Sequence, residues 1–334
     1  MVEHYSKAMR RVVPAALALT FSVLSAGSVS AQANRPSLVE LQQADLRVAT
    51  IGLRLLTANA PRCIRQMPAT GLILHSLAQY GAASRDLALS TWAFPRAVSI
   101  EAIVPGSAAA RAGLQPGDGL VGIAGAALPE SPTQGAPSSA LRDAADERIA
   151  SLPTGSPVRL TVSRSGQEFD VVLDAPPACR TRLEVVSGSS VRARSDGKVI
   201  QLGEQFAAQL DDDSITVALA HELAHTILDH RQRIATLEQA KRPTRSAARQ
   251  FEDEADLLSL HLLALAGWDP AIAPRFMRRE GRQFDPLFSG QSKHRSGKDR
   301  AQRMEDEIAR MKAIGCALPA DQAAKLSLCL PPAG

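Results

Sequence analysis

The sequence predicts an α+β protein in which a strand-rich module precedes a mainly helical one. Between residues 96 and 174, short runs of alternating apolar residues are separated by Pro-Gly and Ser-Gly pairs, a pattern typical of half-buried strands joined by turns. From about residue 180 the apolar spacing becomes helical. The chain has 334 residues, 45% of them hydrophobic, and is long enough to bury more than one core. Its formal net charge of only +4 gives no reason to expect a nucleic-acid partner.

Residues 1–33 have the layout of an export signal. Arg10 and Arg11 precede an apolar stretch, residues 12–24, and Ala31-Gln-Ala33 fits a small-x-small cleavage site. The stretch is shorter than the roughly 20 residues that span a bilayer. We therefore expect a cleaved signal peptide, a periplasmic or otherwise exported protein, and no transmembrane span in the mature chain. An uncleaved membrane anchor is the alternative.

Export would give the four cysteines a structural role. An even number of cysteines in an oxidising compartment favours disulfides, and four cysteines allow three connectivities. We favour Cys63–Cys179 together with Cys316–Cys329, because the first pair would join the two ends of the strand-rich module. Free buried thiols are the alternative.

Residues 34–95 are expected to form a helical and then extended region. Apolar residues recur near helical spacing up to Ala60-Pro61, where the proline ends the helix. Leu72-Ile-Leu74 is expected to be a short strand.

The strand-rich module, residues 96–174, is predicted element by element from its turns. Ser107 can cap a short helix, and Gly113 suits the left-handed conformation that ends it. The expected elements are a strand over 98–104, a helix over 108–112, a strand over 120–123, a helix over 139–152, and a hairpin with arms 158–162 and 169–173.

This succession resembles a bacterial PDZ domain, a small β-barrel or sandwich. The segment Val104-Pro-Gly-Ser-Ala-Ala-Ala-Arg-Ala-Gly-Leu-Gln-Pro-Gly-Asp-Gly-Leu120 carries the resemblance. PDZ domains bind extended peptides by adding a strand beside a helix. The resemblance implies a peptide groove between the strand over 98–103 and the helix over 139–152. A structural module whose groove is unused is the alternative.

Residues 180–334 are predicted to form helices around a small sheet. Ser195-Asp-Gly197 has the chemistry of a hairpin turn, and the acidic run that begins at Asp211 can cap a long helix. The expected elements are strands over 185–191 and 199–202, a helix over 203–210, a helix from Asp211 to at least His230, and a helix over 249–266 that Gly267 ends.

The first long helix carries His221-Glu222-Leu-Ala-His225. Residues four apart lie on one face of a helix, so His221 and His225 can bind the same ion. Zinc takes such ligands, and a catalytic site uses three from the protein and leaves a position for water. Glu222 is offset from the two histidines and suits the base that acts on that water. Two satisfied core histidines beside a surface carboxylate are the alternative.

The second long helix is expected to supply the third ligand. Glu252 can complete the coordination of one Zn2+ ion per chain, and Asp256, one turn further, can accept the second ring N–H of a ligating histidine. Asp253 and Glu254 are expected to face solvent, as most acidic runs do.

Three other histidines are expected to have no part in the site. His230 is expected to pack or to cap the end of the first helix, and His261 is expected to be a satisfied core residue. His75 has no partner that the sequence identifies.

The pairing of His-Glu-x-x-His with Glu-x-x-Ala-Asp resembles the gluzincin metallopeptidases of family 48, the HtpX-, Oma- and BepA-like group. The resemblance covers roughly residues 181–310 and includes Ala266-Gly-Trp-Asp-Pro270 and Ser292-Lys-His294 followed by Arg300. It implies a mainly helical metallopeptidase domain with a small β-sheet. It also implies that His221, His225 and Glu252 bind zinc and that Glu222 is the catalytic base.

The same resemblance implies that His294 and Arg300 lie near the active site, where they stabilise the transition state or gate access to the metal. Arg295 stands where the family has proline, so this loop differs. The edge strand that aligns substrate in the family corresponds here to Val191-Arg-Ala-Arg194, and its two arginines would alter substrate preference.

The sequence therefore predicts an exported zinc endopeptidase whose PDZ-like module, residues 96–174, captures protein or peptide substrates for the metallopeptidase domain, residues 180–334. Quality control of unfolded or misfolded envelope proteins is what the family resemblance implies. The alternative is a latent or non-catalytic peptide-binding or chaperone-like factor, in which a fourth protein ligand such as His294 displaces the catalytic water.

Overall fold

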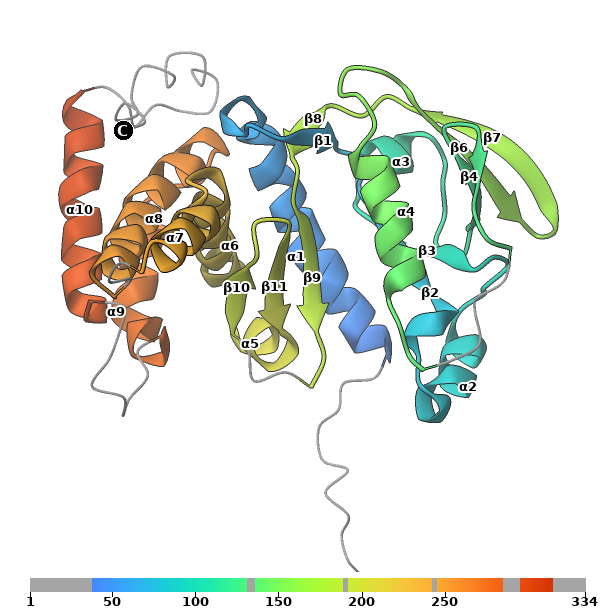
Figure 1. Ribbon diagram of the computed structural model, residues 1–334, viewed down its shortest axis with the longest axis horizontal. Coiled ribbons are helices and arrows are strands. Elements are labelled where there is room, and N and C mark those ends of the chain that lie inside the picture. The colour runs from blue at the N-terminus through green and yellow to red at the C-terminus, as the bar shows by residue number, and fades with distance from the viewer. Residues whose placement is uncertain (1–37, 131–135, 189–191, 242–244, 285–294, 315–334) are drawn as a thin grey trace, which may run out of the picture. The chain divides into compact units, whose positions relative to one another are not determined.

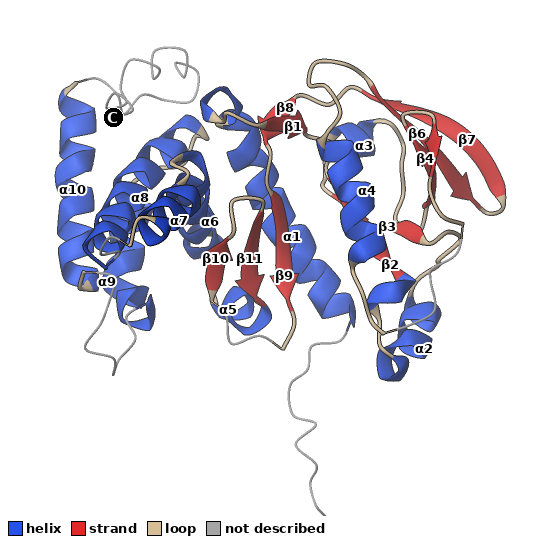
Figure 2. Ribbon diagram, in the orientation of Figure 1, coloured by secondary structure: helices blue, strands red, loops and turns tan. Residues whose placement is uncertain are grey.

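The computed structural model describes residues 38–130, 136–188, 192–241, 245–284 and 295–314 (Figure 1). Helices and strands are both abundant, so the α+β prediction is confirmed (Figure 2). The predicted export signal, His294, Cys316 and Cys329 lie outside the described residues. No helix within those described ranges combines the length and the apolarity needed to cross a bilayer.

Helix α1, Leu38–Ala58, confirms the first helical prediction and packs against the C-terminal half of the protein. Its stripe of Val48, Leu55 and Leu56 is buried in the larger of the two hydrophobic cores. Asn59 follows the helix and is fully buried, and its side-chain amide donates to the carbonyls of Leu55 and Leu262. The two bonds tie the end of α1 to helix α8, so α1 belongs with the helical part of the chain.

A six-stranded sheet with the order β2-β3-β4-β6-β7, in which β5 pairs with β4, forms the strand-rich module. Its elements are β2 Leu72–Ser76, α2 Ala82–Thr91, β3 Val98–Ile103, α3 Ala108–Arg111, β4 Gly119–Ile123, β5 Ala126–Ala127, α4 Ala140–Ala150, β6 Val158–Arg164 and β7 Gln167–Leu173. We call this part, residues 72–173, the sheet module. It has its own core of apolar residues from the strands, α3 and α4. The sheet begins at β2, which lies before the predicted module boundary at residue 96 and pairs with β3.

The predicted peptide groove beside residues 98–103 is also wrong in its choice of strand. β3 lies between β2 and β4 in the sheet, so both of its edges are occupied by neighbouring strands. A strand can be added only at an edge, and the edge strand next to helix α4 is β2. Periodicity identified β3 as a strand but could not reveal which strand lies outermost.

Local turn chemistry in the sheet module matches the sequence. Ser107 caps α3 by accepting a hydrogen bond from the backbone N–H of Ala110. The β6–β7 hairpin turns at Ser165 and Gly166, which have φ values of 52° and 80°. Two successive residues with positive φ are typical of the tight turn that suits the twist of antiparallel strands.

A second, three-stranded sheet has the order β10-β11-β9. Its strands are β9 Arg182–Val186, β10 Ala193–Ser195 and β11 Val199–Gly203. The hairpin predicted around Ser195-Asp-Gly197 exists, but its first arm is β10. This strand directly precedes the turn and pairs in antiparallel orientation with β11, which follows it. The expected first arm over 185–191 is wrong, since β9 runs parallel to β11 on its other side.

Helices complete the C-terminal half of the protein. They are α5 Glu204–Gln209, α6 Asp212–Ile227, α7 His230–Gln239, α8 Arg245–Leu265, α9 Ile272–Phe284 and α10 Gly297–Ala313. Together with α1 and the three-stranded sheet they form what we call the helical module. Asp211 caps α6 as predicted, accepting from the backbone N–H of Ser214 at 2.8 Å.

The long helix predicted to reach His230 ends instead at Ile227. Asp229 adopts the left-handed conformation with φ 51°, and a new helix, α7, begins at His230. A left-handed residue cannot continue a right-handed helix. The break changes the direction of the chain directly after the segment His221-Glu222-Leu-Ala-His225.

The disulfide Cys63–Cys179 confirms the pairing that the sequence favoured. The two cysteines are 116 positions apart, and Cys179 is buried at the end of β8, Pro177–Cys179, which pairs with β1, Gln66–Pro68. The bridge therefore closes the segment that contains the whole sheet module.

We expect the double variant Cys63→Ser, Cys179→Ser to lose about 4–5 kcal/mol of unfolding free energy, because a loop of this length loses much of its freedom in the cross-linked unfolded chain. Denaturant unfolding without reductant measures the loss. The variant Cys316→Ser, Cys329→Ser is the comparison: a bridge between these two cysteines would close a much shorter loop, so its loss should cost less. Equal unfolding free energies for Cys63→Ser, Cys179→Ser and the unmodified protein would contradict a stabilising bridge.

Four charged residues meet where α1, β3, α4 and β9 come together. Arg142 lies 3.0 Å from Glu184, and Asp45 accepts from the backbone N–H of Val185 at 2.8 Å. Burial and, to a smaller extent, the charge of Asp45 raise the pKa of Glu101 to about 8, while Arg142 opposes the shift. Burial likewise raises the pKa of Asp45 to about 7, against the backbone hydrogen bond from Val185.

These shifts predict that unfolding free energy falls as the pH rises from 5 to 8. Between pH 5 and about 7 the unfolded chain has released the two protons while the folded protein still holds them, so each proton contributes a loss of up to about 1.4 kcal/mol per pH unit. From pH 7 to 8 only Glu101 still holds its proton in the folded protein, so the slope becomes smaller. Below pH about 4 both states are protonated and the contribution is complete. We expect Glu101→Gln to make the profile flatter, and the exposed-residue variant Glu130→Gln to leave it unchanged. A Glu101→Gln profile as steep as that of the unmodified protein would refute the assignment.

Candidate metal centre

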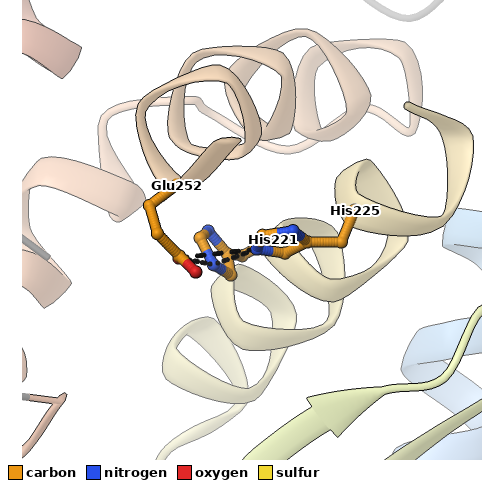
Figure 3. A group of neighbouring side chains, drawn as sticks. All are labelled: His221, His225 and Glu252. Atoms are coloured by element: carbon orange, nitrogen blue, oxygen red, sulfur yellow. Dashed lines mark hydrogen bonds and ion pairs between the residues drawn. The ribbon is translucent and has the colours of Figure 1, made fainter. Parts of the chain in front are cut away.

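Helix α6 presents His221 and His225 from an otherwise buried surface. Its apolar residues fill the core of the helical module, among them Val217, Ala218, Leu219, Ala220, Leu223 and Ala224. The two histidines are one turn apart, as the sequence predicted, and their Nε2 atoms lie 3.1 Å from each other (Figure 3).

Glu252 reaches the two rings from helix α8, which packs against α6. Its Oε2 atom lies 3.2 Å from Nε2 of His221 and 3.5 Å from Nε2 of His225. All three potential ligand atoms lie within 4.8 Å of one another. The structure therefore brings together the three residues that the sequence proposed as metal ligands.

The spacing of these atoms fits a tetrahedral zinc site. Zinc binds histidine nitrogen and carboxylate oxygen at about 2.0–2.1 Å, and the ligands of a tetrahedron with that radius are about 3.3 Å apart. The three observed separations are 3.1, 3.2 and 3.5 Å. Two imidazoles and one carboxylate are also the donor types that zinc accepts, with one position left for water.

Asp256 and Arg300 support His221 on the side of its ring away from Glu252. Asp256 Oδ1 lies 3.0 Å from His221 Nδ1. The sequence predicted that Asp256 would face one of the two candidate ligand histidines, and the structure identifies it as His221. Arg300 donates to both carboxylate oxygens of Asp256, at 2.6 and 2.7 Å, and both residues are buried. The sequence placed Arg300 near the active site, and in the structure its guanidinium forms this ion pair.

The charges in this group determine where protons reside. Burial raises the energy of the Asp256 carboxylate, but the charge and hydrogen bonds of Arg300 outweigh it and hold its pKa at about 2. Burial also opposes protonation of His221, yet its contacts with Asp256 and Glu252 raise its pKa to about 10. A metal ion that binds His221 Nε2 must displace that proton.

A cavity of about 690 Å³ adjoins the three residues, a size typical of sites that bind small molecules or peptide side chains. Glu222 lines this cavity together with residues of β10, the edge strand of the three-stranded sheet. Ser195 of β10 and Thr226 of α6 have hydroxyl oxygens 2.9 Å apart, and this contact holds the strand beside α6. The walls of the cavity thus include the Glu222 carboxylate, the three candidate metal ligands and residues of β10.

The neighbouring carboxylates differ from their prediction as solvent-facing residues. Asp253 forms a bidentate ion pair with Arg295 at 2.9–3.0 Å. Glu254 accepts from His230 at 3.0 Å and from Arg233 at 2.7 Å. The prediction failed because α8 has charged neighbours on more than one side, which the pattern of a single helix cannot reveal.

His230 also has a partner that the sequence did not identify. Its ring is buried, and its Nδ1 lies 2.8 Å from Nδ1 of His225. The prediction that His230 only packs or caps is therefore incomplete. The one available signal was a third histidine five positions after the motif, next to an aspartate that tolerates the left-handed conformation.

The remaining histidines agree with their predictions or add a local contact. His261 is a buried core residue satisfied by Glu307, whose Oε1 lies 2.7 Å from its Nε2. His75 is buried among aromatic rings, with the centroid of Phe94 at 4.4 Å and that of Trp92 at 5.3 Å. Burial lowers the pKa of His75 to about 3, so this ring is neutral.

Comparison with known proteins does not identify a family for this chain. No protein-family model matches the chain, and no characterised protein matches it by sequence. Among solved structures, the chain is similar to the crystal structure of the HtrA3 PDZ domain bound to a phage-derived ligand, FGRWV, with 19% sequence identity and a TM-score of 0.24. The match covers 34% of this chain and 90% of that one. A TM-score this low does not establish a shared fold.

We expect Asp256→Asn to weaken zinc binding by about 10–100-fold, because the amide no longer balances Arg300 or holds His221 as a charged acceptor. Competition with a chromophoric chelator measures the dissociation constant. Asp253→Asn is the matched control, since Asp253 lies on the same helix and pairs with a different arginine. Equal zinc affinities for Asp256→Asn and Asp253→Asn would contradict the role of Asp256.

Proposed function

We propose that this protein is a zinc-dependent endopeptidase that cleaves extended segments of protein substrates. The observation that carries the proposal is the fit of His221, His225 and Glu252 to a tetrahedral zinc site whose adjoining cavity Glu222 lines. The proposal agrees with the gluzincin resemblance of the sequence, which concerns these same residues.

The chemistry divides between the metal and the protein. When bound, zinc supplies a Lewis acid that polarises a peptide carbonyl and lowers the pKa of a water molecule to about 7. The Glu222 carboxylate takes a proton from the attacking water and then returns it to the nitrogen of the leaving amine. Asp256, held by Arg300, keeps His221 in one orientation throughout.

Strand β10 is the element that would align the substrate. It is an edge strand beside the cavity, and main-chain hydrogen bonds to such an edge hold an extended peptide whatever its side chains. A folded protein rarely offers a free extended segment, so we propose unfolded or misfolded proteins as the substrate class.

The compartment in this proposal is outside the cytoplasm. The Cys63–Cys179 disulfide supports it, because disulfides persist in oxidising compartments, and the export signal expected at residues 1–33 agrees. Quality control of envelope proteins in the periplasm is the role we propose.

The second candidate is a latent or non-catalytic peptide-binding factor. One observation favours it independently of the metal: β2 is an edge strand beside helix α4, an arrangement that can bind an extended peptide. The two candidates differ in their use of Glu222, since binding alone needs no base beside the metal ligands.

We expect Glu222→Gln to keep its zinc and to lose about 10²–10⁴-fold in kcat, because the amide cannot accept the proton. The measurements are zinc content by elemental analysis and cleavage of an unfolded protein at fixed zinc. Glu147→Gln, an exposed carboxylate on α4, controls for the loss of one negative charge. If the unmodified protein and Glu222→Gln both hold zinc and neither cleaves the substrate, the result favours the binding factor. If both cleave it at the same measurable rate, the result refutes the mechanism.

A further inference from the structure

His225 is connected to a chain of polar side chains that leads away from the cavity. Its Nδ1 atom lies 2.8 Å from Nδ1 of His230, whose Nε2 lies 3.0 Å from Oε2 of Glu254. Arg233 donates to the same oxygen at 2.7 Å, and Gln250 donates to the other carboxylate oxygen at 2.7 Å. The chain thus runs from a candidate metal ligand through a second imidazole to a carboxylate with its own cation.

The polarity of these groups permits one arrangement of protons once Nε2 of His225 is a ligand atom. A neutral imidazole that binds a metal through Nε2 carries its proton on Nδ1, so His225 is the donor to His230. His230 must then accept at Nδ1 and carry its own proton on Nε2, where Glu254 accepts it. The opposite tautomer of His230 would put two N–H groups face to face and point a lone pair at a carboxylate.

The backbone is bent in a way that makes this contact possible. In a continuous helix, a residue five positions after His225 would lie about 140° around the axis from it. Asp229 breaks the helix with φ 51°, and His230 begins α7 with its ring turned back toward His225. Aspartate is one of the few residue types besides glycine that adopt this conformation readily, so the sequence permits the break at this position.

Packing holds the His230 ring in place from another side. The ring stacks on Phe251 with a centroid separation of 4.5 Å and an interplanar angle of 12°. Arg233 lies over the same phenylalanine, 4.2 Å from its centroid, while its guanidinium donates to Glu254. His230 is only 2% exposed, so its ring has little room to rotate or to exchange its partners for water.

The arrangement parallels the support of the other histidine. His221 faces Asp256, which Arg300 neutralises, and the chain behind His225 ends in Glu254, which Arg233 neutralises. Both carboxylates come from α8, two positions apart, so they project to different sides of that helix. Asp256 reaches His221 directly, whereas Glu254 reaches His225 only through the ring of His230.

We propose that His230 and Glu254 are positioning residues that fix the tautomer and orientation of His225 for metal binding. This inference rests on the zinc site of the proposed function and adds two residues to it. His230 acts as a spacer between the two residues. Its Nδ1 accepts a hydrogen bond from Nδ1–H of His225, and its Nε2–H donates a hydrogen bond to Glu254. Glu254 therefore orients the His225 ring indirectly, through the ring of His230.

The test measures metal affinity rather than activity. His230→Phe keeps an aromatic ring to stack on Phe251 and removes both hydrogen bonds, and Glu254→Gln removes the charge while keeping the size of the side chain. We expect zinc affinity, measured by chelator competition, to fall about 10–100-fold in His230→Phe and by a smaller factor in Glu254→Gln. In the Co2+-loaded protein, His230→Phe should also shift the visible absorption bands, which report ligand geometry.

His261→Phe is the matched control. His261 is another buried histidine bonded to a glutamate at 2.7 Å, but neither it nor Glu307 is among the candidate ligands or the residues that line the cavity. We expect this variant to lose thermal stability and keep its zinc affinity. An equal loss of affinity in His261→Phe and His230→Phe would show a general effect of destabilisation and would overturn the proposal.

Unchanged zinc affinity in both His230→Phe and Glu254→Gln would overturn it as well and would leave the proposed peptidase intact. If His230→Phe does not fold, Glu254→Gln decides the question alone. Failure of the unmodified protein to bind zinc would instead refute the function on which the inference rests, so the two failures are distinguishable.

Discussion

The packing of helix α6 against helix α8 is the contact on which the candidate site depends. It brings residues 221–225 next to residues 252–256, and neither segment has a complete ligand set alone. Both helices are anchored by apolar side chains of one core, so the three ligand atoms are held at spacings that suit zinc without an unusual backbone in either helix. The rigidity of a packed core is what makes such a site specific, because displacements of a few tenths of an ångström would change the fit.

Polar side chains then decide how the two imidazoles are oriented within that frame. A histidine on a helix can rotate about two torsions, and only a hydrogen bond at its second nitrogen selects one ring position and one tautomer. Here α8 supplies carboxylates on two of its sides, Asp256 toward α6 and Glu254 toward α7. Each carboxylate is paired with an arginine, which keeps it charged. Helix α8, which carries the candidate ligand Glu252, therefore also carries both of these carboxylates.

The rest of the chain is fastened to this frame by a few long-range links. Helix α1 enters the core of the helical module, and Asn59 at its end bonds to α8. The Cys63–Cys179 disulfide closes the segment that carries the sheet module, whose own core is separate. The chain thus has two edge strands that lie beside helices: β2 beside α4 in the sheet module, and β10 beside α6 at the candidate metal centre.

The sequence by itself determined the features that depend on neighbours along the chain. The spacing of His221 and His225, the caps at Ser107 and Asp211, and the turn at Ser165-Gly166 follow from helix and turn geometry. The candidate ligand set could also be predicted, because Glu252 lies one helical turn before Asp256 on the second long helix. The favoured disulfide followed from its position at the two ends of a module.

Only the tertiary structure decided which elements become neighbours. Periodicity indicates that a strand or helix has a buried face, but not what covers that face, so β9 and β2 were assigned to the wrong partners or to none. For the same reason the sequence left His230 and Glu254 without a role. Their contact needs the left-handed turn at Asp229 and the packing of α7 on α8, and both arise from interactions between residues that are distant in the sequence.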